Sequence, residues 1–277
     1  MINRSLIECI PKVKRDRLTL AIFLLGGPFA VWFEFFIVMP GYDFNSDLVW
    51  AHKIFCAFTA VQVYWNLFYM LRTDTSMRSL HHRLVDIDKT VMKKCRECED
   101  VPPRSHHCKL CDICILKRDH HCWFAGYCVG YQNHRYYLMV IFYCWLAGVY
   151  ATIYHCQFMI ETLNFGLNLR SLTSLVAPHV VWVLGYYTLY EFFIAGILDV
   201  ANYVEVLLSW LLIRQVLQIK NGQTAHERTT GDRQYQKGWR RNVEEILGRR
   251  WYLVWVAPCV PSDLPPVEDH WTGKKTD

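Results

Sequence analysis

The sequence predicts an α-helical integral membrane protein, with four transmembrane helices and a cytosolic two-zinc cysteine-rich module between spans 2 and 3. Two observations lead to this fold class. Hydrophobic residues make up 53% and aromatic residues 15% of the 277 residues, and they gather in long uncharged runs, which is typical of membrane proteins. Residues 95–128 hold seven of the twelve cysteines and four of the twelve histidines, a density typical of metal sites.

The first half of the membrane region is predicted to be a transmembrane hairpin, residues 18–71. The basic segment at 1–17 precedes it, and positively charged flanks stay on the cytosolic side. The apolar run at 18–39 is long enough to span, whereas the apolar region of a signal peptide, the alternative, is shorter. The turn that follows lacks lysine and arginine and therefore fits the far side. A second span at roughly 49–71 returns the chain to the cytosol.

Residues 72–136 are predicted to form a cytosolic zinc domain. Basic residues follow the second span and indicate the cytosolic side; they are Arg72, Arg78, Arg83, Lys89, Lys93 and Lys94. The reducing cytosol keeps thiolates free for metal binding and nucleophilic attack. A disulfide framework is the alternative for such a stretch, but no cleaved secretory signal precedes it, so we favour zinc.

Residues 137–219 are predicted to hold spans 3 and 4. The third span covers roughly 137–160, and a later apolar stretch of more than 40 residues has room for two crossings. Two crossings would put the segment at 220–277 on the far side, although its many basic residues favour the cytosol. We therefore expect one crossing at about 196–218, after an interfacial or membrane-embedded segment near 165–195. Acidic residues in this region should lie near interfaces or face a polar interior; they are Glu191, Asp199 and Glu205.

Three C-x2-C pairs interlock in the cysteine-rich stretch. They are Cys95/Cys98, Cys108/Cys111 and Cys111/Cys114. This spacing lets two thiolates of one tight turn reach a single tetrahedral zinc ion. Two closed sites need about eight ligands, whereas the stretch offers seven cysteines and four histidines. Because side chains of sequence neighbours diverge, the runs at 106–108 and 120–122 should each give some members to a site and spare others.

This pattern resembles the cysteine-rich domain of the DHHC protein S-acyltransferases, the palmitoyltransferases. The matching positions are Cys95-x2-Cys98, Pro103-Arg104, His107-Cys108-x2-Cys111-x2-Cys114, Asp119-His120-His121-Cys122, Cys128-Val129-Gly130 and Asn133. Two weaker matches lie behind the last span. Thr224 and Glu227 resemble the family's Thr-Thr-x-Glu motif, with Ala225 at the second threonine, and Asn242 resembles part of its C-terminal packing motif.

Interleaving the ligands gives two structural zinc sites, and the resemblance implies the same division. One site takes Cys95, Cys98, His107 and Cys114, and the other takes Cys108, Cys111, His121 and Cys128. His106, His120 and Cys122 are spared. The resemblance then makes Cys122 the nucleophile, with His120 as its base and Asp119 orienting the imidazole, an arrangement that activates a thiol.

The implied reaction moves palmitate or a related fatty acyl group in two steps. Cys122 attacks the thioester of a fatty acyl-CoA, and a cysteine of a client protein then takes the acyl group. We expect clients with cytosolic juxtamembrane cysteines, an acyl chain held within the lipid bilayer, and no nucleic-acid partner. Phe124 and Ala147 are candidate acyl-chain contacts; a small residue at 147 would admit longer chains. Candidates for the phosphates of coenzyme A are Lys117, Arg118 and Arg135.

The loop after Cys122 departs from the family. The family has Pro-Trp-x-Asn-Asn before the last cysteine, whereas residues 123–127 are Trp-Phe-Ala-Gly-Tyr. A catalytically weak or inactive zinc-containing membrane scaffold or chaperone of the same fold is therefore the alternative function. A second alternative, a membrane ubiquitin ligase, is disfavoured because Cys122 and Cys128 do not form the terminal C-x2-C pair that closes such domains. A third reading makes Cys122 or His120 a further metal ligand, which the ligand count disfavours.

The last four residues, Lys274-Lys275-Thr276-Asp277, match a dilysine retrieval pattern. This pattern acts on cytosolic tails of endoplasmic reticulum membrane proteins. We therefore expect a multi-pass protein of the endoplasmic reticulum membrane, with the Golgi membrane as the alternative. Both termini and the zinc domain are expected in the cytosol.

Overall fold

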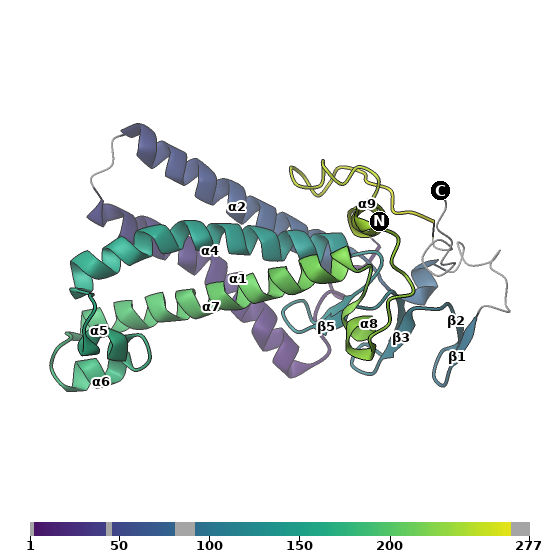
Figure 1. Cartoon of the computed structure of the whole chain (residues 1–277), viewed down its shortest axis with the longest axis horizontal. Coiled ribbons are helices and arrows are strands. Elements are labelled where there is room, and N and C mark those ends of the chain that lie inside the picture. Colours follow the sequence, from purple (N-terminus) through teal and green to yellow (C-terminus); the bar gives the residue numbers. More distant parts are fainter. Residues whose placement is uncertain (1–2, 43–45, 81–91, 267–277) are drawn as a thin grey trace. The chain divides into compact units, whose positions relative to one another are not determined.

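The computed structural model describes residues 3–42, 46–80 and 92–266. The chain divides into two compact units, each built from separate stretches of sequence. Figure 1 labels the helices and strands along the chain. Unit 1 comprises Met1–Leu25, Val61–Val140 and Ile213–Asp277, and unit 2 comprises Gly26–Ala60 and Ile141–Leu212. The cysteine-rich stretch belongs to unit 1, and each of the four long helices is divided between the two units.

Among the described residues, four helices are long and apolar enough to cross a membrane. They are α1 (Lys14–Phe33), α2 (Ser46–Arg72), α4 (His134–Leu163) and α7 (Leu189–Lys220). The first is extended by a π-helical turn, η1 (Glu34–Val38), and a 3-10 turn, η2 (Met39–Gly41). The predicted fold class is confirmed: a helical protein with four candidate spans, and a cysteine-rich module between the second and third of them.

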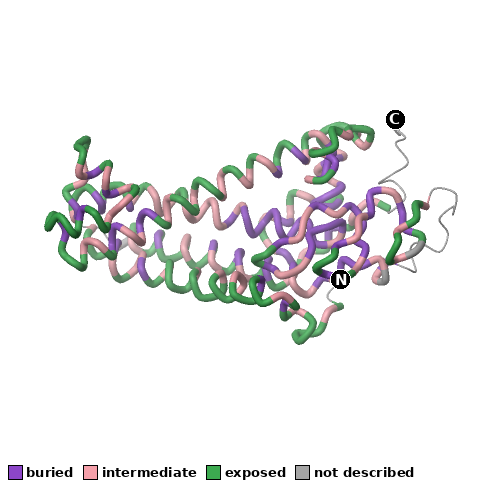
Figure 2. Tube along the Cα trace, turned by 90° about the horizontal axis from the view of Figure 1, so that it is seen from below, coloured by how far each residue is buried: buried purple, intermediate pink, exposed green. Residues whose placement is uncertain are grey.

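The outer faces of these helices suit a bilayer. A helix satisfies its own backbone hydrogen bonds, which is necessary in hydrocarbon. Large apolar side chains remain exposed along the helices, for example Leu25 at 72%, Ile54 at 66% and Val206 at 69%. In Figure 2 buried positions are concentrated in the cysteine-rich module and are sparse along the helices. We therefore expect lipid to cover the exposed apolar side chains.

The fourth long helix begins earlier than the expected start near residue 196. Two short helices, α5 (Leu169–Ser174) and α6 (Pro178–Val183), precede it in the segment predicted to be interfacial or embedded. The Thr188 hydroxyl accepts a hydrogen bond from the Glu191 amide, and the Glu191 carboxylate accepts one from the Thr188 amide. This reciprocal arrangement starts a helix. Glu191 is therefore a helix cap.

The cysteine-rich module consists of three antiparallel hairpins. Their strands are β1 (Lys93–Cys95) with β2 (Glu99–Val101), β3 (Ser105–Cys108) with β4 (Ile113–Leu116), and β5 (His120–Cys122) with β6 (Tyr127–Val129). A 3-10 turn, η3 (Met77–Leu80), packs on β4. Hairpins this short are marginally stable alone, so the module depends on its metal sites and on the rest of unit 1.

Two helices of the C-terminal segment, α8 (Ala225–Thr230) and α9 (Trp239–Leu247), join the module through buried charges. Arg104 donates two hydrogen bonds of 2.7 Å to the Glu227 carboxylate of α8. Lys117 lies 2.7 Å from the Glu245 carboxylate of α9. Breaking such a buried pair costs about 3–5 kcal/mol because a charge is left without its partner. These contacts therefore fix α8 beside the start of β3 and α9 beside the end of β4.

Candidate active site

Two hairpins form the first cluster of donor atoms. His107 and Cys114 are directly opposite each other in the β3–β4 ladder, so their side chains project from the same face. Cys95 ends β1, and Cys98 lies in the turn that follows. The Nδ1 atom of His107 lies 3.3 Å from the Cys98 sulfur and 3.9 Å from the Cys114 sulfur. All four donor atoms lie within 4.8 Å of one another.

The second cluster repeats this geometry with the third hairpin. His121 and Cys128 are opposite each other in the β5–β6 ladder, and Cys108 and Cys111 come from the tip of the β3–β4 hairpin. The Nδ1 atom of His121 lies 3.3 Å from the Cys111 sulfur and 3.7 Å from each of the other two sulfurs. One hairpin therefore serves both clusters, which interlocks the two sites as the interleaved assignment expects.

The spacing of the donor atoms fits tetrahedral zinc. With Zn–S bonds of about 2.3 Å and Zn–N bonds of about 2.0–2.1 Å, the edges of the tetrahedron measure about 3.6–3.8 Å. The nitrogen-to-sulfur distances of both clusters, 3.3–3.9 Å, bracket these values. Three thiolates and one imidazole fill four positions. Both clusters can therefore hold a structural metal ion with no position open to substrate.

Strand alternation keeps His120 and Cys122 out of the second cluster. Side chains two positions apart on a strand share a face, so these two residues of β5 project opposite to His121. Cys122 is 8% exposed. The remaining spared residue, His106, packs its ring against His226 of α8, with ring centroids 4.1 Å apart. Burial lowers the pKa of His106 to about 4, so its ring is neutral in this contact.

Asp119 is buried and held from three directions. Its Oδ2 atom lies 2.9 Å from Nδ1 of His120 and accepts a 3.1 Å hydrogen bond from the Gln215 side chain of α7. Its Oδ1 atom accepts a 2.7 Å hydrogen bond from the backbone amide of Ala225. The Oε1 atom of Gln215 lies 2.7 Å from Nε2 of His134. Position 225, where the family motif has its second threonine, therefore contacts Asp119 through its backbone amide.

The surroundings of Asp119 and His120 favour the ionised form of each side chain. Burial disfavours a carboxylate, but the hydrogen bond with His120 and the nearby histidines outweigh it and hold the pKa of Asp119 well below its usual value. Burial also disfavours the imidazolium. Hydrogen bonds with Asp119 and Cys122 outweigh that effect and raise the pKa of His120 to about 9. The ring of Tyr137 covers His120 edge-on, with centroids 4.7 Å apart.

Comparison with known proteins agrees with this geometry. The family described as DHHC palmitoyltransferase matches residues 88–232, just over half of the chain. The chain belongs to the DHHC palmitoyltransferase family. It is 33% identical to the "Probable palmitoyltransferase ZDHHC24" of Danio rerio over 80% of this chain and 76% of that protein. It is 30% identical to the Homo sapiens protein of the same name over 76% and 74% of the two chains.

A plant relative extends the range of the comparison. The chain is 30% identical to the "Probable protein S-acyltransferase 13" of Arabidopsis thaliana over 62% of this chain and 53% of that protein. Membership of the DHHC palmitoyltransferase family makes this protein a protein S-acyltransferase. The two metal clusters and the Asp119–His120–Cys122 constellation lie within the residues that the family matches.

The two candidate acyl-chain contacts of this DHHC protein lie in different units. Phe124 is 46% exposed, and its ring centroid lies 6.2 Å from that of Phe23 on α1. Ala147 is half-buried in the part of α4 that belongs to unit 2. Phe124 and Ala147 therefore each remain a candidate contact for the acyl chain, and each is judged from its own neighbours.

Two of the basic residues suggested for coenzyme A do not face solvent. Lys117 is 3% exposed and pairs with Glu245. Arg135 is also 3% exposed and donates to the backbone oxygen of Ser262. Arg118 is half-buried, and although burial lowers the pKa of its guanidinium, the sulfurs of Cys128 and Cys108 are close enough to raise that pKa overall. We therefore assign Lys117 and Arg135 to the fold, and Arg118 to the surroundings of the second cluster.

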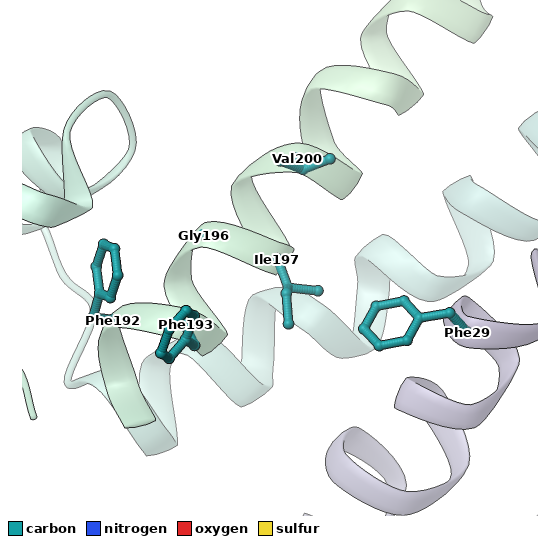
Figure 3. Close-up of a pocket in the computed structure, with 6 residues that line it drawn as sticks. All are labelled: Phe29, Phe192, Phe193, Gly196, Ile197 and Val200. Carbon is teal, nitrogen blue, oxygen red and sulfur yellow. The ribbon is translucent and has the colours of Figure 1, made fainter. Parts of the chain in front are cut away.

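Unit 2 has an apolar groove of about 260 Å³ (Figure 3). It is lined by Phe29, Phe192, Phe193, Gly196, Ile197 and Val200. In Figure 3 the side chains of Ile197 and Phe29 face each other, with no polar side chain among those that line the groove. A groove of this composition on membrane-spanning helices offers no reactive group and suits hydrocarbon.

Proposed function

We propose that this protein carries a fatty acyl group from acyl-CoA to a client cysteine through a thioester on Cys122. The observation that supports this most is the division of residues in β5. His121 turns to the metal cluster, whereas Cys122 lies on the opposite face with His120 and the buried Asp119. A thiol next to an imidazole that is oriented by a carboxylate is the composition of an activated nucleophile.

In the first step the Cys122 sulfur attacks the carbonyl carbon of the acyl-CoA thioester. A new carbon–sulfur bond forms, the bond to the coenzyme A sulfur breaks, and coenzyme A leaves as a thiolate that takes a proton. His120, with its pKa raised to about 9, is protonated at neutral pH, and an imidazolium favours the reactive thiolate beside it. The same imidazolium supplies the proton to the leaving group.

In the second step His120, now neutral, takes the proton of a client cysteine thiol, and the resulting thiolate attacks the acyl group on Cys122. The Cys122 sulfur leaves as a thiolate and is again stabilised by the imidazolium of His120. Asp119 keeps the imidazole oriented through both steps, because three hydrogen-bonding groups hold its carboxylate. Zinc, when bound to the two clusters, supplies rigidity to the hairpins.

The test is incubation with an alkyne-tagged palmitoyl-CoA, followed by a chase with a client-like peptide. The peptide carries one cysteine next to an apolar anchor. We expect a hydroxylamine-labile label on the wild-type chain that moves to the peptide, and no label on Cys122→Ala. A label that persists on Cys122→Ala, or that never leaves the enzyme, favours the scaffold function instead.

We propose that Phe124 and Ala147 contact the acyl chain and that the small side chain at 147 admits long chains. Each added methylene in an apolar pocket is worth about 1–3 kcal/mol. We therefore expect Ala147→Phe to lower the autoacylation rate about 10-fold or more with the longest donors, measured across donors of about 14 to 20 carbons. The matched control is Val149→Phe, on the same helix but 37% exposed. If the wild type rejects every donor longer than palmitoyl-CoA, this assignment is wrong.

We propose that both termini and the metal module face the cytosol, and that the protein resides in the endoplasmic reticulum membrane. The basic residues that flank the long helices support the orientation. The dilysine pattern at residues 274–277 supports the location and lies outside the described residues. Terminal tags should be stained after permeabilisation of the plasma membrane alone, and Lys274→Ser with Lys275→Ser should move the protein to the Golgi. Staining of either tag only after full permeabilisation contradicts the orientation.

A further inference from the structure

A carboxylate of the first long helix lies against the second metal cluster. Asp16, in the first turn of α1, is 1% exposed, and its Oδ2 atom lies 2.9 Å from Nε2 of His121. His121 directs its other ring nitrogen, Nδ1, at the sulfur atoms of the cluster. An imidazole that ligates a metal through Nδ1 carries its proton on Nε2. His121 therefore donates this hydrogen bond, and Asp16 accepts it.

The loop after Cys122 packs against the same helix, α1. The Thr19 hydroxyl donates a 2.7 Å hydrogen bond to the backbone oxygen of Trp123. The guanidinium of Arg15 lies 4.3 Å from the centre of the Trp123 ring, and Phe23 packs on Phe124. Arg15, Thr19 and Phe23 recur every four residues, so they share one face of α1. This helix face therefore contacts the loop over several residues.

The segment before α1 contacts the end of this loop. Gly126 has a φ of +59°, and a Cβ atom on it would lie 2.2 Å from the Cγ atom of Pro11. Only a residue without a side chain fits this close approach. Gly126 departs from the family pattern at this position, and the departure is matched by the segment that packs on it.

The first cluster has no equivalent among the described residues. The nearest carboxylate to the free nitrogen of its histidine belongs to Asp112, at 3.7 Å from Nε2 of His107. This distance is too long for a hydrogen bond, and the Asp112 side chain is 82% exposed. Within the part of the chain that the structure describes, a buried carboxylate therefore supports His121 of the second cluster but not His107 of the first.

We propose that Asp16 is a positioning residue of the second zinc site. It holds the ring of His121 in the orientation that ligates the metal, and it thereby fixes the strand that carries Cys122. The proposal rests on the proposed function only in taking His121 as a zinc ligand. Carboxylates that orient a ligating histidine change metal affinity about 10–100-fold.

A pocket of about 350 Å³ gives solvent a route to this site. Asp16, His121 and Cys111 line it together with residues of the N-terminal segment. A chelator can therefore be used to measure how firmly the metal is held. Zinc release from the detergent-solubilised full chain is followed with EDTA and a zinc-responsive dye, and exposed cysteines are mapped by alkylation and mass spectrometry.

We expect Asp16→Asn to release one of its two zinc ions about 10-fold faster or more than the wild type. Alkylation should then appear at Cys108, Cys111 and Cys128, while Cys95, Cys98 and Cys114 stay protected. Asp112→Asn is the matched control, because it makes the same change beside the other ligating histidine, and it should release zinc at the wild-type rate. Wild-type release from Asp16→Asn, or equal loss from both sites, overturns the proposal.

A second comparison removes the hydrogen bond between His121 and Asp16 by changing its donor, His121, instead of its acceptor. In His121→Cys the ligand has no N–H to donate, so adding Asp16→Asn should leave the rate of zinc release unchanged. A further acceleration in the double variant contradicts the proposal, because it places the effect of Asp16 outside His121. The zinc content of the wild type tests the two ligand sets separately from the role of Asp16. Fewer than two zinc ions per chain refutes the ligand sets, whether or not Asp16→Asn changes the rate of zinc release.

Discussion

Cys122→Ser is expected to abolish thioester formation and to leave both zinc ions in place. The reason is the geometry of β5, in which Cys122 projects away from the cluster that His121 joins. A serine hydroxyl is about the same size but remains protonated, so we expect the rate of hydroxylamine-labile labelling to fall about 10³-fold or more. The measurement pairs labelling by palmitoyl-CoA with the zinc content of the same sample.

The control for this prediction is Cys128→Ser, which removes a donor atom of the second cluster. That variant should lose zinc as well as labelling. If Cys122→Ser also loses a zinc ion, then Cys122 is a metal ligand and the division of residues proposed for β5 is wrong.

Asp119→Asn is expected to slow acylation of Cys122 by about 10²–10⁴-fold, the range that positioned acid–base groups contribute. The carboxylate fixes the imidazole of His120 and favours its charged form. The neutral asparagine amide retains an oxygen for the Ala225 amide, so the surrounding structure should persist. Single-turnover labelling with palmitoyl-CoA measures the rate.

Gln215→Met is the graded control for Asp119. It removes the 3.1 Å hydrogen bond to the carboxylate and leaves those with His120 and Ala225. We expect a loss much smaller than that of Asp119→Asn. Equal rates for Asp119→Asn and the wild type would show that His120 works without its carboxylate.

The parts of the fold that depend on local sequence could be predicted. Apolar run length indicates the four spans, and C-x2-C spacing indicates turns that present two sulfurs to one ion. The ladders add the reason for the interleaving, since His107 faces Cys114 and His121 faces Cys128 across strands. Strand alternation was not visible in the sequence alone, although it separates His121 from its two neighbours.

Residues that support the site from a distance could not be predicted. Asp16 and Gln215 lie 105 and 96 positions from the groups they contact. The available signals were weak, because Asp16 is an acidic residue within a basic segment and Gln215 is an amide within an apolar run. The sequence also suggested Lys117 and Arg135 as contacts for coenzyme A, although both side chains are buried. A buried basic residue and a solvent-facing one look the same in the sequence, so their burial could not be predicted.

The central claim is that the Cys122 sulfur carries the acyl group while both metal sites stay closed. Native mass spectrometry of the full chain after brief exposure to palmitoyl-CoA tests it most directly. We predict one species with a single palmitoyl group and two zinc ions, and digestion that places the thioester on Cys122. An acyl group on a different cysteine, or acylation that occurs only with loss of zinc, contradicts the claim.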